Sequence, residues 1–137
     1  MISKGADCVT AMMTISEIDV GLDSGVESMR WAAAAAAGEL VASRPWDVWR
    51  LVLRHGASED EDTRAAVATC MLEHLLESHF DTFFPLIENH IRSGGILLGD
   101  TLRRCWKLGI AERPENAKRW DRLINDWRKI RSRCNEC

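Results

Sequence analysis

The chain has 137 residues, of which 46% are hydrophobic and 28% charged, values typical of one globular domain that exclude a disordered protein. No stretch approaches the roughly 18 apolar residues of a membrane span, and the N-terminus lacks a secretory pattern, so we expect a cytoplasmic protein without membrane contact. Residues 1–100 hold 7 Lys or Arg and 16 Asp or Glu, whereas residues 101–137 hold 11 and 5, which gives an acidic body and a basic end.

The first 25 residues predict a weakly ordered leader, because they contain three glycines and little hydrophobic periodicity. A short helix around residues 11–18 is the most that this segment indicates. Helical patterns follow over residues 27–42 and 45–56. Pro45 suits a first helical turn, where its missing N–H would be unpaired, and Gly56 suits the end of that helix.

Four more helices are predicted from their start and stop residues. The third begins in the acidic run 59–62 and continues to Ser78, and the fourth follows Asp81 and ends at Gly94 and Gly95. The fifth covers 96–108, the sixth runs from Pro114 to about residue 132, and residues 134–137 form a frayed tail. Because every connection is short, we expect an all-α domain over 26–133 built from three stacked antiparallel helix hairpins.

An internal repeat appears at the start of each hairpin as an acidic residue three positions before an arginine. The arginines are followed by small or apolar residues, and the second helix of each hairpin begins with large apolar ones. The spacing places both charges on one helix face. We expect these pairs to serve structure by linking neighbouring hairpins: Glu27 with Arg30, Glu61 with Arg64, and Asp100 with Arg103.

This pattern resembles HEAT repeats, with the best match from Asp62 through Ile91. The resemblance covers about residues 27–132, and the more basic, tryptophan-rich third hairpin resembles a capping repeat. It implies a short, curved α-solenoid that binds a partner along the face lined by the second helices and performs no catalysis. Some relatives of this type bind nucleic acid, but no residue of their active sites is found in this chain.

The leading hypothesis is therefore a non-enzymatic adaptor that binds a protein partner. Its predicted contacts are outward polar positions of the second helices: Arg50, Arg54, Glu88, Arg92, Arg122 and Lys129. A more specific alternative is an immunity-type protein that neutralises a toxin, since such proteins are small, acidic and helical.

A third hypothesis is weak nucleic-acid binding through the last helix. Lys118, Arg122, Lys129 and Arg133 form one stripe of that helix, a pattern that suits phosphate contacts. The overall pI of about 5.8 favours a solvated end helix or an acidic protein partner instead.

Cysteines, histidines and tryptophans give no catalytic or metal-binding pattern, so no cofactor or metal is predicted. Cys134 and Cys137 form a lone C-x-x-C, which is half a zinc site or an exposed pair that oxidises. His74 and Glu77 lie three apart, which fits a surface pair. Cys70 and Cys105 suit the core, as do the tryptophans, including Trp46 and Trp106.

Overall fold

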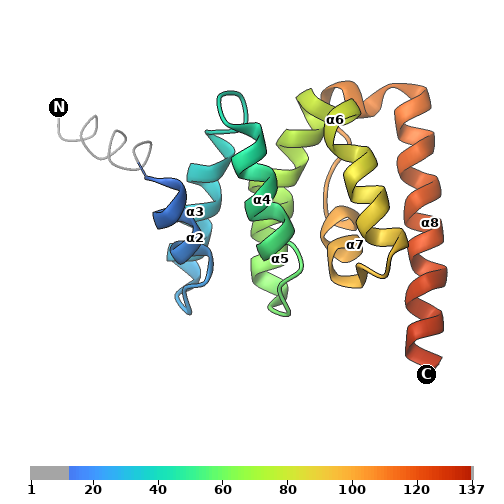
Figure 1. The fold of residues 1–137 in the computed structure, drawn as a ribbon, viewed down its shortest axis with the longest axis horizontal. Coiled ribbons are helices and arrows are strands. Elements are labelled where there is room, and N and C mark those ends of the chain that lie inside the picture. Colours follow the sequence, from blue (N-terminus) through green and yellow to red (C-terminus); the bar gives the residue numbers. More distant parts are fainter. Residues whose placement is uncertain (1–12, 137) are drawn as a thin grey trace.

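The computed structural model describes residues 13–136, in which helices are the only regular secondary structure (Figure 1). The predicted all-α class is therefore confirmed for this part of the chain. No helix among the described residues is long and apolar enough to cross a bilayer. The elements, including one π-helix (η1) and one 3-10 helix (η2), are α2 Ile15–Leu22, α3 Glu27–Gly38, α4 Pro45–His55, α5 Glu61–Val67, η1 Ala68–Leu72, α6 Glu73–Arg92, α7 Ile96–Arg103, η2 Gly109–Glu112 and α8 Pro114–Glu136.

Contacts between the helices follow chain order in two series. Helices α2, α4, α6 and α8 each contact the next, and so do α3, α5 and α7. The helices are consequently arrayed side by side along the long axis, with α2 and α3 at one end and α8 at the other (Figure 1). Each helix buries one face between its neighbours, so a single core runs through the array.

The predicted leader 1–25 is wrong for its second half, because α2 is a capped helix packed into the core. The Thr14 side chain accepts from the backbone N–H of Glu17 at 3.1 Å, and the Glu17 carboxylate accepts from the Thr14 N–H at 3.2 Å. This reciprocal capping box fixes the start of the helix. Ile18 and Leu22 are fully buried against α3. Residues 1–12 lie outside the described part of the chain.

The break predicted between Ser78 and Asp81 is present as a kink rather than a loop. His79 has non-helical backbone angles inside α6, with φ −129° and ψ 36°. The predicted third helix therefore corresponds to α5, η1 and the first turns of α6, and the fourth corresponds to α6 after His79.

The fifth helix is shorter than predicted, because α7 ends at Arg103 rather than at residue 108. Contacts with the neighbouring helix replace further helical hydrogen bonds: the Cys105 thiol donates to the Ala68 carbonyl at 3.5 Å, and the Trp106 N–H bonds the Glu73 carboxyl. Trp106 lies in this non-helical segment and is 76% exposed, so its predicted place in the core is wrong. The predicted frayed tail also differs, because α8 continues to Glu136.

The core contains large aromatic side chains between the even-numbered helices and alanines between the odd-numbered ones. Phe80 and Phe84 stack with centroids 4.5 Å apart, and Trp127 is 1% exposed. Trp46 packs edge-on against the buried Phe83 ring, at 4.9 Å, but remains half exposed, so its predicted burial is only partial.

Arginine–aspartate pairs join the odd-numbered helices to one another. Arg30 of α3 donates to Asp62 of α5 at 2.7 Å, and Arg64 of α5 donates to Asp100 of α7 at 2.9 Å. The expected link between neighbours is present, but it is not formed by the predicted pairs within one helix. Of those, Glu27 with Arg30 and Glu61 with Arg64 form no ion pair within 4 Å in the described residues, whereas Asp100 and Arg103 do, at 2.6 Å.

The same hydrogen bonds recur at a spacing of 34 residues. Arg30 donates to the Ser24 carbonyl at 3.0 Å, and Arg64 donates to the Ser58 carbonyl at 2.8 Å. Each serine hydroxyl also accepts from the backbone N–H two positions later. This equivalence sets the register in which the two parts of the chain are compared below.

Candidate partner-binding groove

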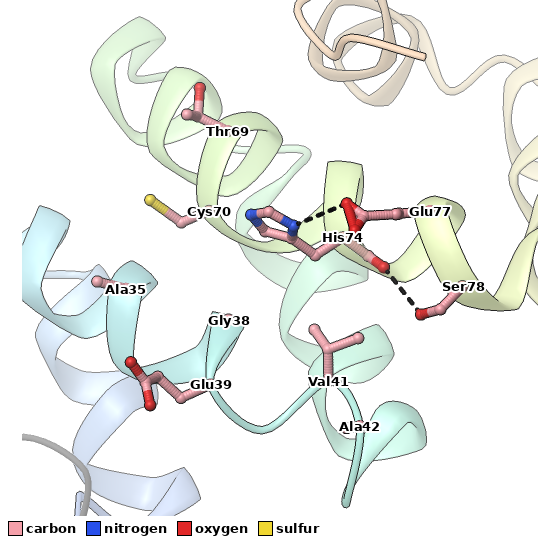
Figure 2. A pocket seen from close by; sticks show the side chains of 10 residues that line it. All are labelled: Ala35, Gly38, Glu39, Val41, Ala42, Thr69, Cys70, His74, Glu77 and Ser78. Atoms are coloured by element: carbon pink, nitrogen blue, oxygen red, sulfur yellow. Dashed lines mark hydrogen bonds and ion pairs between the residues drawn. The ribbon is translucent and has the colours of Figure 1, made fainter. Parts of the chain in front are cut away.

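An open groove of about 600 Å³ runs between the end of α3 and the η1–α6 segment (Figure 2). The turn after α3 and the C-terminal residues of that helix form one wall, and the other wall belongs to η1 and the first turns of α6. Its lining residues are Ala35, Gly38, Glu39, Val41, Ala42, Thr69, Cys70, His74, Glu77 and Ser78. Because the groove spans two helical elements that are distant in sequence, it depends on how they pack.

A close helix approach creates this groove. A side-chain carbon at Gly38 would overlap the backbone carbonyl oxygen of Cys70, so only glycine lets α3 end against η1 at this distance. Cys70 lies within the π-helix, whose wider turn adds a residue to the helix at this point. Such π-helical turns are frequent at functional sites.

Negative charge dominates the groove. Glu39 and Glu77 lie on opposite walls, and none of the ten lining residues, all in the described part of the chain, is Lys or Arg (Figure 2). The last turn of α3 also carries no basic residue, so the partial negative charge of its terminal carbonyls adds to that of Glu39. The apolar carbons of Ala35, Val41 and Ala42 lie beside these charges, which suits the aliphatic stem and charged end of a lysine or arginine.

The groove has the side chains of a nucleophilic site but not their activation. His74 Nδ1 lies 3.5 Å from Glu77 Oε2, and both side chains are about half exposed, as predicted for a surface pair. Burial, with a smaller effect of Glu73, raises the pKa of the Cys70 thiol. A nucleophilic cysteine needs a lowered pKa instead. Within the described residues, no group of three or more His, Cys, Asp or Glu is placed to hold a metal ion.

The predicted partner-binding residues lie elsewhere, and half of them bridge neighbouring helices. Arg54 of α4 pairs with Asp19 of α2 at 2.5 Å, Arg92 of α6 pairs with Asp126 of α8 at 2.8 Å, and Glu88 of α6 pairs with Arg119 of α8. These contacts give Arg54, Glu88 and Arg92 a structural role between even-numbered helices.

The other three predicted contacts point outward. Arg50 pairs only locally with Asp47, at 3.0 Å, and its side chain is 76% exposed. Arg122 and Lys129 are exposed on α8, on the predicted basic stripe with Lys118 and Arg133. The structure thus separates the predicted set into bridging residues and surface residues.

An aspartate–histidine cluster holds α2 against α4 beside the Arg54 pair. His55 is 2% exposed, and its Nε2 lies 2.6 Å from Asp19 and its Nδ1 3.4 Å from Asp23. Burial opposes ionisation of Asp19, but hydrogen bonds from His55 and Arg54 outweigh it, so the pKa of that carboxyl is lowered.

Comparisons with models of known protein families, with curated proteins and with solved structures gave no match for this chain. What the chain does is therefore argued from its own residues.

Proposed function

We propose that this chain is a short HEAT-like helical-repeat module that binds a protein partner without catalysing a reaction. Each repeat, here called a unit, comprises one odd-numbered helix and the even-numbered helix that follows it. The observation that supports the repeat reading most directly is the recurrence of the same Arg30 and Arg64 contacts 34 residues apart. Repeat stacks of this kind offer extended surfaces to partners.

The groove of Figure 2 supplies the partner site in this proposal. It lies at the junction of two units, is open to solvent, and combines carboxylates with apolar carbons. Charge complementarity therefore favours a partner segment that carries lysine or arginine. The protonated thiol of Cys70 and the surface position of His74 support binding rather than catalysis.

The test is affinity capture from lysate of the native cells, using the full chain in three forms. The first is wild type, and the second carries Glu39→Lys with Glu77→Gln, which alters groove charge at exposed positions. The third carries Arg50→Glu, Arg122→Glu and Lys129→Glu, which reverses the surface cations that the sequence predicted as contacts. Capture is quantified by mass spectrometry with and without nuclease.

The expected result is one stoichiometric protein that survives nuclease and is lost from the groove variant alone. Loss from the third form alone would assign binding to the even-numbered helices and contradict the groove. A captured set that disappears with nuclease would instead support nucleic-acid binding through α8 and contradict a protein-binding function.

A further inference from the structure

A second groove, of about 770 Å³, opens between α2 and α3 at the end of the array opposite α8 (Figure 1). Its lining is mainly apolar and includes Met13, Val20, Met29 and Ala32. Val20 is 73% exposed and Met29 is 55% exposed, which is unusual for apolar side chains that lie together. Exposed apolar patches of this kind mark interaction sites.

The repeat register shows what this face lacks. In the 34-residue register that relates Ser24 to Ser58, Met29 corresponds to Thr63 and Ala32 to Ala66. Thr63 is 4% exposed and Ala66 is fully buried, because α3 packs over α5. Positions that are covered by neighbouring helices inside the array are therefore uncovered at this end.

The same comparison holds on the neighbouring helix. Val20 corresponds to Arg54, which is tied to Asp19 and Asp23 of the preceding helix. At the end face an apolar side chain thus replaces the charged one, and solubility normally requires the reverse at a terminal repeat. The face has the composition of a buried surface.

Its charge indicates the kind of helix that would cover it. Glu17 and Asp23 are among the lining residues, and no lysine or arginine is among the lining residues of this described groove. Two copies meeting through this face would bring these like charges together, whereas a basic partner would neutralise them.

We propose that the α2–α3 groove binds an amphipathic helix of another protein, with its apolar face on Val20, Met29 and Ala32 and with lysine or arginine beside Glu17. The helix occupies the place that a neighbouring unit takes inside the array. This inference extends the proposed protein-binding function to a second surface, which is separate from the groove of Figure 2.

The test uses two fluorescein-labelled helical peptides of about 18 residues, each with a leucine face, flanked in one by lysine and in the other by glutamate. Fluorescence anisotropy measures their binding to the full chain. We expect the lysine peptide to bind at least about tenfold more tightly than the glutamate peptide. Val20→Ser with Met29→Ser should weaken the lysine peptide by about tenfold, because both lost side chains line the groove.

Matched variants separate this site from non-specific attraction. Val26→Ser changes an equally exposed apolar residue outside the groove lining and should leave binding unchanged. Glu17→Gln removes one charge but keeps the capping-box acceptor, so it should weaken only the lysine peptide. The groove variant Glu39→Lys with Glu77→Gln should have no effect here, which distinguishes failure at this surface from failure of the proposed function.

Two outcomes would overturn the inference. One is equal binding of both peptides, or binding that is indifferent to the Val20 and Met29 changes. The other is a dimer of the full chain, seen by light scattering after size exclusion, that the double variant converts to monomer, since that would make the face an interface between copies.

Discussion

Replacing Gly99 by alanine tests how α7 and α8 pack. A methyl carbon at this position would lie 2.7 Å from Cγ of Trp127 and closer still to its Cδ1 and Nε1. The indole ring has little freedom to move, because it is 1% exposed and its Nε1 donates to the Ile96 carbonyl at 2.9 Å. Arg131 also lies over the ring, 4.7 Å from its centroid.

The expected loss of unfolding free energy follows from three contributions. Overpacking of this kind costs about 1–3 kcal/mol. Weakening the indole hydrogen bond adds about 0.5–1.5 kcal/mol. Alanine has the better helix propensity, which returns roughly 1 kcal/mol. We therefore expect Gly99→Ala to destabilise the protein by about 1–3 kcal/mol.

Urea denaturation followed by tryptophan fluorescence and circular dichroism measures this change. A loss of about 2 kcal/mol lowers the urea midpoint by roughly 1 M at an ordinary slope. The matched control is Gly25→Ala, because a methyl group there meets nothing within 4 Å. The control should be neutral or stabilising by up to about 1 kcal/mol. Equal midpoints for the two variants would refute the packing that the structure shows between α7 and α8.

Three further predictions concern charged and thiol groups. Burial opposes ionisation of Asp100, but hydrogen bonds from Arg103, Arg104 and Arg64 outweigh it and hold the pKa of the carboxyl well below its usual range. This stabilisation is complete above the unfolded pKa of about 4 and is lost as pH falls towards the folded value, so Asp100→Asn should flatten the fall of the urea midpoint between about pH 5 and 2. Arg64→Met, which removes a bridge between helices, should cost about 1.5–3 kcal/mol, whereas Arg103→Met, which removes a pair within one helix, should cost about 0.5 kcal/mol or less; equal losses in urea would contradict the bridging role. Burial raises the pKa of the Cys105 thiol well above its usual value, so iodoacetamide at pH 8 should modify exposed Cys134 first and Cys105 only on unfolding, as peptide mapping would show.

Much of the helix order was predictable from residues that act locally. Pro45 begins α4, and the acidic run supplies the cap of α5, where the Asp60 side chain accepts from the Thr63 N–H at 2.9 Å. Pro114 begins α8. These signals depend on backbone hydrogen bonding within one turn, so the rest of the fold is not needed to read them.

The missed helix α2 had a signal of the same kind. Thr14 and Glu17 have the spacing of a capping box, and Ile18 and Leu22 lie one helical turn apart. The glycines that suggested a loose leader obscured it. Gly21 instead permits contact, because a side-chain carbon there would lie 2.7 Å from the Cβ of Ala33.

Other features depended on contacts that local patterns do not encode. Trp106 matched a helical core position only if the fifth helix continued past Arg103, and hydrogen bonds with η1 and α6 end that helix early. The first groove is likewise set by packing, since Glu39 and Cys70 come together only where Gly38 meets η1. The acid–arginine periodicity was visible in sequence, whereas the actual partners lie one unit away.

The arginine–aspartate ladder, which runs from Arg30 to Asp100, ends on both sides for chemical reasons. In the 34-residue register Asp62 corresponds to Ser28, so α3 offers no carboxylate to a preceding arginine. Asp62 and Thr63 recur as Asp100 and Thr101, which places Leu102, fully buried, where a further arginine would be. A helix that covers the α2–α3 face therefore has no ladder aspartate to bind, and apolar contact with Val20 and Met29 must supply most of its affinity.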